Sequence, residues 1–266
     1  MSILFLDIDD TLLSHQTFTV PESARRGLQL AKERGHQLFL CSGRFEKGLG
    51  EYYDPDLFDG LVASSGAAGI YHQKVIYRHF LDEEDARKIF AITEEYGIGL
   101  FVHSPEYNRM NQYAYERLAV ILQRDEDAMR ELGIRRLNGF PEEPVIKMDI
   151  FYRKDSPLKE ILAAMPEKTD VISHINPDKD DFGSEVTRKG INKGSGIRET
   201  LQYLNADQKD AYGFGDSAND IPMLQACGTG IAMGNGTQSV KEAADYITTD
   251  IDEDGIWNAL KHFRLI

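Results

Sequence analysis

The sequence predicts an α/β fold in which a Rossmann-like, doubly wound parallel sheet is interrupted by an inserted α+β domain. At both ends of the chain, short apolar runs alternate with helical segments, which is typical of βαβ units. The middle of the chain departs from this alternation and indicates an antiparallel sheet with helices. We therefore expect a core made of residues 1–81 and 187–266, and an inserted domain over 82–186.

The elements of the core follow from apolar runs and from helix start and stop signals. SILFLDI at 2–8 is a near-continuous apolar run, as in a strand buried on both faces. Pro21 and Gly35 bound a helix with Ala24 and Leu28 on one face. The remaining strands are expected at 36–41, 60–64, 210–215, 230–234 and 245–249, and the remaining helices at 194–204, 219–227, 237–244 and around Trp257.

The inserted domain is expected to follow a hairpin at 69–80 that turns near His72 and Gln73. An amphipathic helix over 82–97 opens it, with Ala86 and Ile89 facing inward. Further strands are expected at 98–103, 145–152, 170–175 and 181–187, and further helices at 112–129 and 156–165.

Composition and charge exclude several classes of protein. With 44 acidic against 30 basic residues, the chain lacks the basic surface with which proteins follow nucleic-acid backbones. Its apolar runs are too short for a signal peptide or a membrane span, so we expect a cytoplasmic protein with no membrane partner. Cys41 and Cys227 lie outside any metal or disulfide pattern, and the oligomeric state has no signal in the sequence.

Acidic side chains gather where predicted strands end. Asp7 and Asp9 are two positions apart at the end of the first strand, so they can share one face. Asp216 follows a later strand, and Asn219 and Asp220 begin the next helix. Open α/β sheets bind ligands at the carboxyl ends of their strands. If the two strands are neighbours, the aspartates meet, and all-oxygen ligands of this kind suit Mg²⁺.

Two further features indicate a phosphate site. Ser42 and Gly43 follow a predicted strand at an expected helix start, where a hydroxyl and backbone N–H groups can hold anionic oxygens. Lys193 lies near the start of another helix and supplies a positive charge for phosphate.

These motifs resemble those of the haloacid dehalogenase (HAD) superfamily of phosphohydrolases. DIDDT at 7–11 is similar to its D-x-D-x-T motif, and GDSAND at 215–220 to its G-D-x-x-N-D motif. Ser42 and Lys193 stand at its second and third motifs. The long insertion, with SGR, EVTRKGINKG and GIAMGNG, resembles the Cof-type branch with a type IIB cap, which contains phosphatases of sugar phosphates and other small phosphorylated metabolites.

The resemblance implies a Mg²⁺-dependent phosphatase that works through an aspartyl-phosphate. Asp7 would be the nucleophile and Asp9 the acid and base. Mg²⁺ would be held by Asp7, by the backbone carbonyl of Asp9 and by Asp216, with Asp220 as support. The phosphoryl oxygens would be held by the backbone at Ile8 and Gly43 and by Ser42, Lys193 and Asn219.

Two positions depart from the family pattern. The family usually has Gly where this chain has Asp10, and we expect Asp10 to affect only the turn. The family commonly has Asn-Gly where this chain has Ser65-Gly66, a change that can alter substrate contacts. No motif names the substrate, and five residues of the inserted domain are candidate contacts to its leaving group: His103, Tyr107, Arg109, Asn111 and Lys147.

Two other functions stay open. A phosphosugar mutase would use the same aspartyl-phosphate, and a non-catalytic metabolite-binding regulator could use the same fold. The histidines, His15 included, have no metal spacing and are expected at the surface. DIDEDG at 250–255 imitates a calcium loop, but Lys261 stands where a bidentate Glu is required, so we expect a loop and a helix start.

Overall fold

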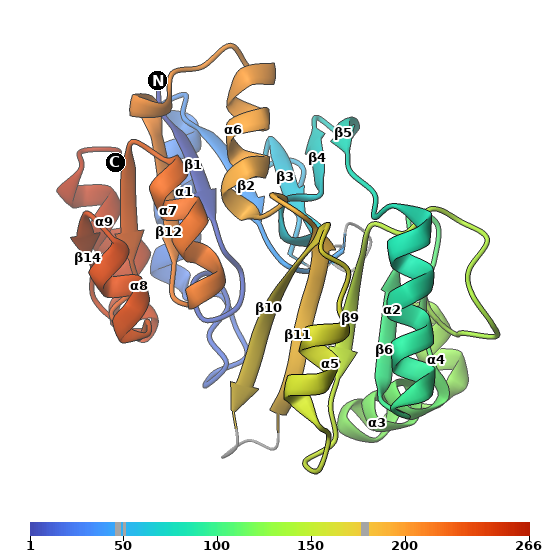
Figure 1. Ribbon diagram of the computed structural model, residues 1–266. Coiled ribbons are helices and arrows are strands. Elements are labelled where there is room, and N and C mark those ends of the chain that lie inside the picture. Colours follow the sequence, from blue (N-terminus) through green and yellow to red (C-terminus); the bar gives the residue numbers. More distant parts are fainter. Residues whose placement is uncertain (46–48, 50–51, 177–180) are drawn as a thin grey trace. The chain divides into compact units, whose positions relative to one another are not determined.

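The computed structural model describes residues 1–45, 49, 52–176 and 181–266, and the chain divides into two compact units (Figure 1). The core unit comprises Met1–Arg78 and Ile191–Ile266, and the inserted unit comprises His79–Gly190. Both ends of the chain thus build one unit and its middle builds the other. The domain boundaries expected from the sequence, at 81/82 and 186/187, stay predictions.

The core unit is built on an eight-stranded sheet in the order β14-β13-β12-β1-β2-β3-β4-β5. From β14 to β3 neighbouring strands run parallel, and β4 and β5 add an antiparallel hairpin at one edge. The strands are β1 (Ile3–Leu6), β2 (Gln37–Cys41), β3 (Gly60–Ala63), β4 (Ala68–Tyr71), β5 (Lys74–Arg78), β12 (Ala211–Gly215), β13 (Thr229–Ala232) and β14 (Tyr246–Ile247).

Helices cover both faces of this sheet because its central strands are buried on both sides (Figure 1). Leu4 and Leu6 of β1 pack in a cluster with α1 (Glu22–Glu33) and α9 (Gly255–His262). Ile3 and Phe5 point to the other face, in a cluster with α6 (Lys193–Tyr203), α7 (Ile221–Ala226) and α8 (Gln238–Ala243). Each such side chain stabilises the fold by about 1.5–3 kcal/mol, so the strand ends are held on a rigid platform.

The inserted unit contains a six-stranded sheet in the order β10-β11-β9-β6-β7-β8, which is antiparallel except between β7 and β8. Its strands are β6 (Gly99–His103), β7 (Asn108–Met110), β8 (Ile134–Arg136), β9 (Lys147–Phe151), β10 (Thr169–Asn176) and β11 (Asp181–Arg188). Its helices are α2 (Glu83–Glu95), α3 (Gln112–Leu122), α4 (Glu126–Glu131) and α5 (Leu158–Ala164).

The predicted fold class is confirmed, but one helix was predicted wrongly. The helix expected at 112–129 is two helices, because Gln123 takes a left-handed conformation with φ 50° and Asp125 caps α4 by accepting from a main-chain N–H. The three-residue strands β7 and β8 were missed, since segments this short carry no clear periodicity. A helix starts at Gly255, as expected, and the loop expected before it contains a short 3-10 helix at Ile251–Glu253.

Two smaller findings concern membranes and cysteines. None of the helices in the described part of the chain is long and apolar enough to cross a membrane. Cys41 and Cys227 are both buried and carry free thiols.

Candidate active site

Two neighbouring strands end at the same edge of the core sheet, and an aspartate follows each of them. β1 pairs with β12 so that Leu6 lies opposite Phe214. The N–H of Asp7 extends this pairing with a 3.0 Å bond to the Phe214 carbonyl. Asp216 comes directly after β12. The sheet thus brings together two acids that lie near opposite ends of the sequence.

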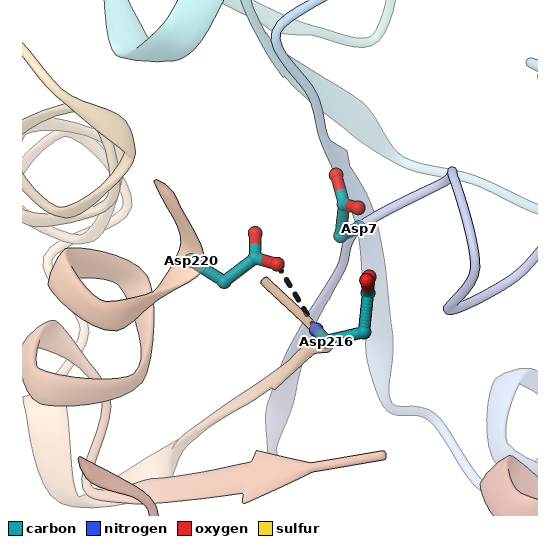
Figure 2. A group of neighbouring side chains, drawn as sticks. All are labelled: Asp7, Asp216 and Asp220. Carbon is teal, nitrogen blue, oxygen red and sulfur yellow. Dashed lines mark hydrogen bonds between the residues drawn. The ribbon is translucent and has the colours of Figure 1, made fainter. Parts of the chain in front are cut away.

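A third acid, Asp220, completes a group of carboxylates (Figure 2). One oxygen each from Asp7, Asp216 and Asp220 lies within 4.8 Å of the others. The Asp220 Oδ2 accepts bonds of 3.0 Å from the main-chain N–H groups of Asp216 and Ser217, the first of which Figure 2 draws. The Thr11 hydroxyl donates to Asp216 Oδ1 at 2.9 Å. Asp220 is therefore held by the turn that follows β12, and Asp216 by the segment that follows β1.

The Lys193 ammonium is the positive charge among these acids. Its Nζ lies 2.6 Å from Asp7 Oδ1 and 2.5 Å from Asp220 Oδ1, and its side chain is 2% exposed. Lys193 begins α6, whose start is fixed by a capping box between Asn192 and Ser195. We call Asp7, Asp216, Asp220 and Lys193 the core cluster. In it, three acids share one lysine.

The pKa values show that this one lysine does not compensate the acids. Burial raises the pKa of Asp7 well above its usual value, and the charges of Asp220 and Asp216 add to the rise, which Lys193 only partly opposes. Burial and Asp220 raise the pKa of Asp216 to about 7. Burial alone would lower the pKa of Lys193, but Asp220 and Asp7 raise it well above its usual value. The cluster therefore has a deficit of positive charge.

The residues present fit a metal ion, which would supply the positive charge that this cluster lacks. The available donors are carboxylate oxygens, which Mg²⁺ prefers. A divalent cation beside Asp7 and Asp216 would favour their ionised forms, as Lys193 alone cannot. The Asp220 oxygens are already bonded to Lys193 and to main-chain N–H groups, which suits a supporting position.

Asp9, the fourth acid expected at the site, has other partners in the structure. Its carboxylate accepts from Arg44 through Nη2 at 2.6 Å and Nε at 3.1 Å. Its side chain is 37% exposed, so it lies nearer to solvent than the core cluster. The Arg44 guanidinium also stacks over the Tyr52 ring, 4.8 Å from its centroid. Arg44 had no predicted role, although it belongs to the SGR motif after β2.

Four of the residues expected to hold phosphate follow the strands β1, β2 and β12. Ser42 follows β2 and is 1% exposed, and its hydroxyl accepts from the Arg44 N–H at 3.2 Å. Within the part of the chain that the structure describes, no protein acceptor bonds the N–H of Ile8 or of Gly43. The Asn219 carbonyl oxygen accepts from the Ser217 hydroxyl at 2.7 Å, which leaves its amide group to donate elsewhere.

The turn at Ser64–Gly66 joins two parts of this site. Its three residues have φ values of 51°, 56° and 95°, a left-handed run in which only Gly is free of strain. The Ser65 N–H donates to the Ser42 carbonyl at 3.1 Å. A Cβ on Gly66 would collide with the Asn192 carbonyl, so the turn packs directly against the start of α6. The effect of Ser65-Gly66 on substrate contacts stays a prediction, and the structure adds that this turn packs against the backbone just before Lys193.

Three of the candidate contacts in the inserted unit have structural partners. The Asn111 side chain caps α3, accepts a second main-chain N–H and donates to a main-chain carbonyl. Arg109 forms two 2.7 Å bonds with Glu143. Tyr107 lies beneath the Arg135 guanidinium, 3.5 Å from its ring centroid.

The other two candidates belong to one buried group on β6, β9 and β11. Lys147 Nζ lies 3.0 Å from Asp149 and 3.2 Å from Glu185, and the His103 Nε2 lies 2.7 Å from Asp149 Oδ2. We call these four residues the inserted-unit cluster.

The chain is similar over its whole length to known phosphatases. A family model of haloacid dehalogenase-like hydrolases matches residues 4–260. The putative phosphatase YkrA of Bacillus subtilis is 27% identical, with 99% of this chain and 98% of the relative covered. The 5-amino-6-(5-phospho-D-ribitylamino)uracil phosphatase YitU of the same organism is 24% identical, with 98% and 97% covered.

Among solved structures, the HAD subclass IIB sugar phosphatase BT4131 is similar with a TM-score of 0.85 and 30% identity, and both chains are covered completely. The phosphatase BT1666 from Bacteroides thetaiotaomicron has a TM-score of 0.83 and 25% identity, with 100% of this chain and 96% of that chain covered.

Proposed function

Because this chain belongs to the haloacid dehalogenase-like hydrolases, as a Cof-type member, and is a phosphatase, we propose that it hydrolyses small phosphorylated metabolites with Mg²⁺ and through an aspartyl-phosphate. The observation that carries this proposal is the core cluster, in which Lys193 contacts Asp7 and Asp220 and Asp216 adds a third acid. Asp7, a buried carboxylate next to two others at a strand end, is suited to act as a nucleophile beside a metal ion.

The ion would be held by the carboxylates of Asp7 and Asp216 and by the backbone carbonyl of Asp9. Asp220 would support them, since it fixes the N–H of Asp216 and binds Lys193. A bound Mg²⁺ would supply positive charge for the oxygens of the phosphoryl group.

Asp7 would carry out the first chemical step. A carboxylate oxygen of Asp7 attacks phosphorus in line, an aspartyl-phosphate bond forms, and the bond from phosphorus to the leaving oxygen breaks. Five donors of the core unit would stabilise the charge on the phosphoryl oxygens. They are the N–H groups of Ile8 and Gly43, the Ser42 hydroxyl, the Lys193 ammonium and the Asn219 amide.

Asp9 would move the protons of both steps. It donates a proton to the leaving oxygen while the phosphorus–oxygen bond breaks, and then takes a proton from the water that attacks the aspartyl-phosphate. Hydrolysis restores Asp7 and releases inorganic phosphate. Its position outside the core cluster suits this role, because Asp9 must reach the leaving group and not the metal with its side chain.

Sugar phosphates are the substrate class that we propose first. The support is the likeness to BT4131, which is described as a sugar phosphatase. YitU shows that a relative of this length acts on a phosphorylated ribityl compound, which also carries a polyhydroxylated chain. A small phosphorylated molecule is therefore the expected partner.

A substrate panel tests the proposal. The purified chain is assayed for phosphate release from sugar phosphates, nucleotides and other phosphorylated metabolites, with Mg²⁺ or with EDTA, and scored as kcat/KM. Asp7→Asn is the matched control. We expect Mg²⁺-dependent release by the wild type and a phosphoryl group on Asp7 in peptides from quenched reactions.

Two results would contradict it. Release that persists in Asp7→Asn would exclude this nucleophile, and an absence of release from every compound would exclude the activity. Phosphorus NMR of the products adds a distinction, because a mutase would leave an isomerised sugar phosphate where a phosphatase leaves inorganic phosphate.

A further inference from the structure

Two residues that the proposed chemistry does not use connect to Asp9 in a short chain of contacts. The His15 ring lies between two carboxylates, with Nε2 at 3.2 Å from Asp9 Oδ1 and Nδ1 at 3.0 Å from Asp10 Oδ2. The main-chain N–H of His15 also donates to Asp10 Oδ1 at 3.2 Å. Asp10 therefore holds His15 by both its backbone and its ring, and this fixes the direction in which Nε2 points.

The backbone of Asp10 is held firmly, in a conformation that favours glycine. Its φ is 58°, in the left-handed region where Gly is free of strain and a side chain costs about 1 kcal/mol. Its N–H donates to the Leu13 carbonyl at 2.9 Å, and its carbonyl accepts from the Asn235 amide at 2.7 Å. Asn235 is anchored in turn by the N–H of Ile251. A carboxylate at a strained and anchored position suggests that the side chain has a use.

That use is found at the Asp9 carboxylate. Arg44 binds both of its oxygens, and His15 contacts Oδ1 from the loop that follows β1. The two contacts come from different segments of the core unit, one before α1 and one after β2. Two partners on different sides restrict the rotation of a side chain more than one partner can. Asp9 is thus held although more than a third of its side chain is exposed.

We propose that Asp10 and His15 are positioning residues for Asp9, which set the place from which Asp9 delivers its proton to the leaving oxygen. The inference depends on the proposed acid and base role of Asp9. In that step the proton leaves Asp9 for the leaving oxygen as its bond to phosphorus breaks, and His15 and Asp10 neither gain nor lose a bond to the substrate. Their effect is geometric, since proton transfer requires hydrogen-bond distance and alignment.

This role has a signature in the leaving group. An aliphatic phosphate ester needs protonation of its leaving oxygen, whereas p-nitrophenyl phosphate releases a stable phenolate without it. Disturbing Asp9 should therefore lower kcat/KM, which reports formation of the aspartyl-phosphate, for the first substrate and spare it for the second. A general disturbance of the phosphate site would slow both equally.

The test compares Asp10→Gly and His15→Gln with the wild type on an aliphatic phosphate that it hydrolyses and on p-nitrophenyl phosphate. We expect kcat/KM to fall about tenfold on the aliphatic ester and less than about twofold on p-nitrophenyl phosphate, since kcat also contains the second step, in which Asp9 acts on both substrates alike. The double variant should lose no more than either single variant, because both act through one contact. Asp10→Gly is informative because Gly suits φ 58° and removes only the carboxylate. Gln16→Ala, in the same loop, is the control and should leave both rates unchanged.

Equal losses of kcat/KM on the two substrates, additive losses in the double variant, or no loss would overturn the inference. A second measurement does not depend on activity: crystal structures of the wild type and Asp10→Gly should show the Asp9 carboxylate released from His15 in the variant. An unmoved Asp9 would overturn the inference. Failure of the proposed function is distinguishable, because it would appear as wild-type turnover that is absent or does not depend on Asp7.

Discussion

The core cluster and the inserted-unit cluster are built from similar groups with opposite electrostatic results. Each contains a lysine with 2% exposure that contacts two carboxylates. In the inserted-unit cluster, burial would raise the pKa of Asp149, but Lys147 and His103 lower it below its usual range. In the core cluster the pKa of Asp7 is raised. Folding therefore favours the ionised form of Asp149 and disfavours the ionised form of Asp7.

The difference lies in the number of acids for each cation. Asp149 contacts His103 and Lys147, and Lys147 also contacts Glu185. Asp7 faces one lysine that is shared with Asp220, while Asp216 adds a further negative charge. A smaller excess of acids over cations makes a stable group of charges, and a larger excess makes a site that can bind a cation. Four predictions test this comparison.

The largest effect is expected from removing one acid of each cluster. Asp7→Asn should lower kcat by about 10⁴-fold or more, because it removes the nucleophile. It should also raise the melting temperature of the metal-free protein, since at pH 7 an ionised Asp7 whose folded pKa is raised opposes folding. Asp149→Asn should lower the melting temperature, because the pKa of Asp149 is lowered by folding. A lower melting temperature for Asp7→Asn would contradict the comparison.

The next effect comes from removing each lysine. Lys193→Met should lower kcat by about 10²–10³-fold, as loss of a charged donor to the transition state does. Lys147→Met should lower the free energy of unfolding by about 3 kcal/mol, because it leaves Asp149 and Glu185 buried without their shared cation. Steady-state kinetics and urea unfolding of both variants measure the two effects. If Lys193→Met kept wild-type kcat, Lys193 would have no role in the chemistry.

A smaller effect is expected from Mg²⁺ on stability. Ligand binding at 100 times its dissociation constant stabilises a protein by about 2.7 kcal/mol, so Mg²⁺ should raise the melting temperature and EDTA should reverse the rise. Asp216→Asn should weaken the response, whereas Asp149→Asn should retain it. Thermal unfolding at several Mg²⁺ concentrations gives the measurement. An equal response in all three proteins would place the ion elsewhere.

The fourth effect is a pH dependence of opposite sign in the two clusters, measured in EDTA. The pKa of Asp216 is raised to about 7, so the folded state binds its proton more tightly and stability should fall as pH rises from about 4 to 7. The pKa of Asp149 is lowered, so its contribution is present above about pH 4 and is lost as pH falls. Asp216→Asn should flatten the first range and Asp149→Asn the second. Urea unfolding at each pH provides the free energies.

Much of the site could be predicted because its residues stand at element ends that the pattern of apolar residues reveals. Asp7, Ser42 and Asp216 each follow a buried strand, and Lys193 begins a helix. What the sequence did not reveal is the pairing of side chains: Asp220 with Lys193, and Asp9 with Arg44 and His15. Hydrogen bonds between residues far apart in the chain leave no periodic signal.

The role of Asp10 shows the same limit. Its position in the motif indicated a turn, and the structure adds a carboxylate that holds His15. The split between α3 and α4 is similar, since the left-handed conformation of Gln123 ends an apolar pattern that by itself continues.

The sequence by itself determined the α/β class, the insertion and the positions of the acidic residues. The reason is that a helix or strand with a buried face repeats its apolar residues at a fixed spacing, which is visible within each short segment of the chain. The tertiary structure alone decided that β12 lies beside β1, and with it that three aspartates share one lysine. Strand order depends on packing energies summed over the whole core, and no single segment of the sequence reveals this sum. We infer the metal ion from the excess of negative charge at the site. This excess arises only when the strands pair in that order.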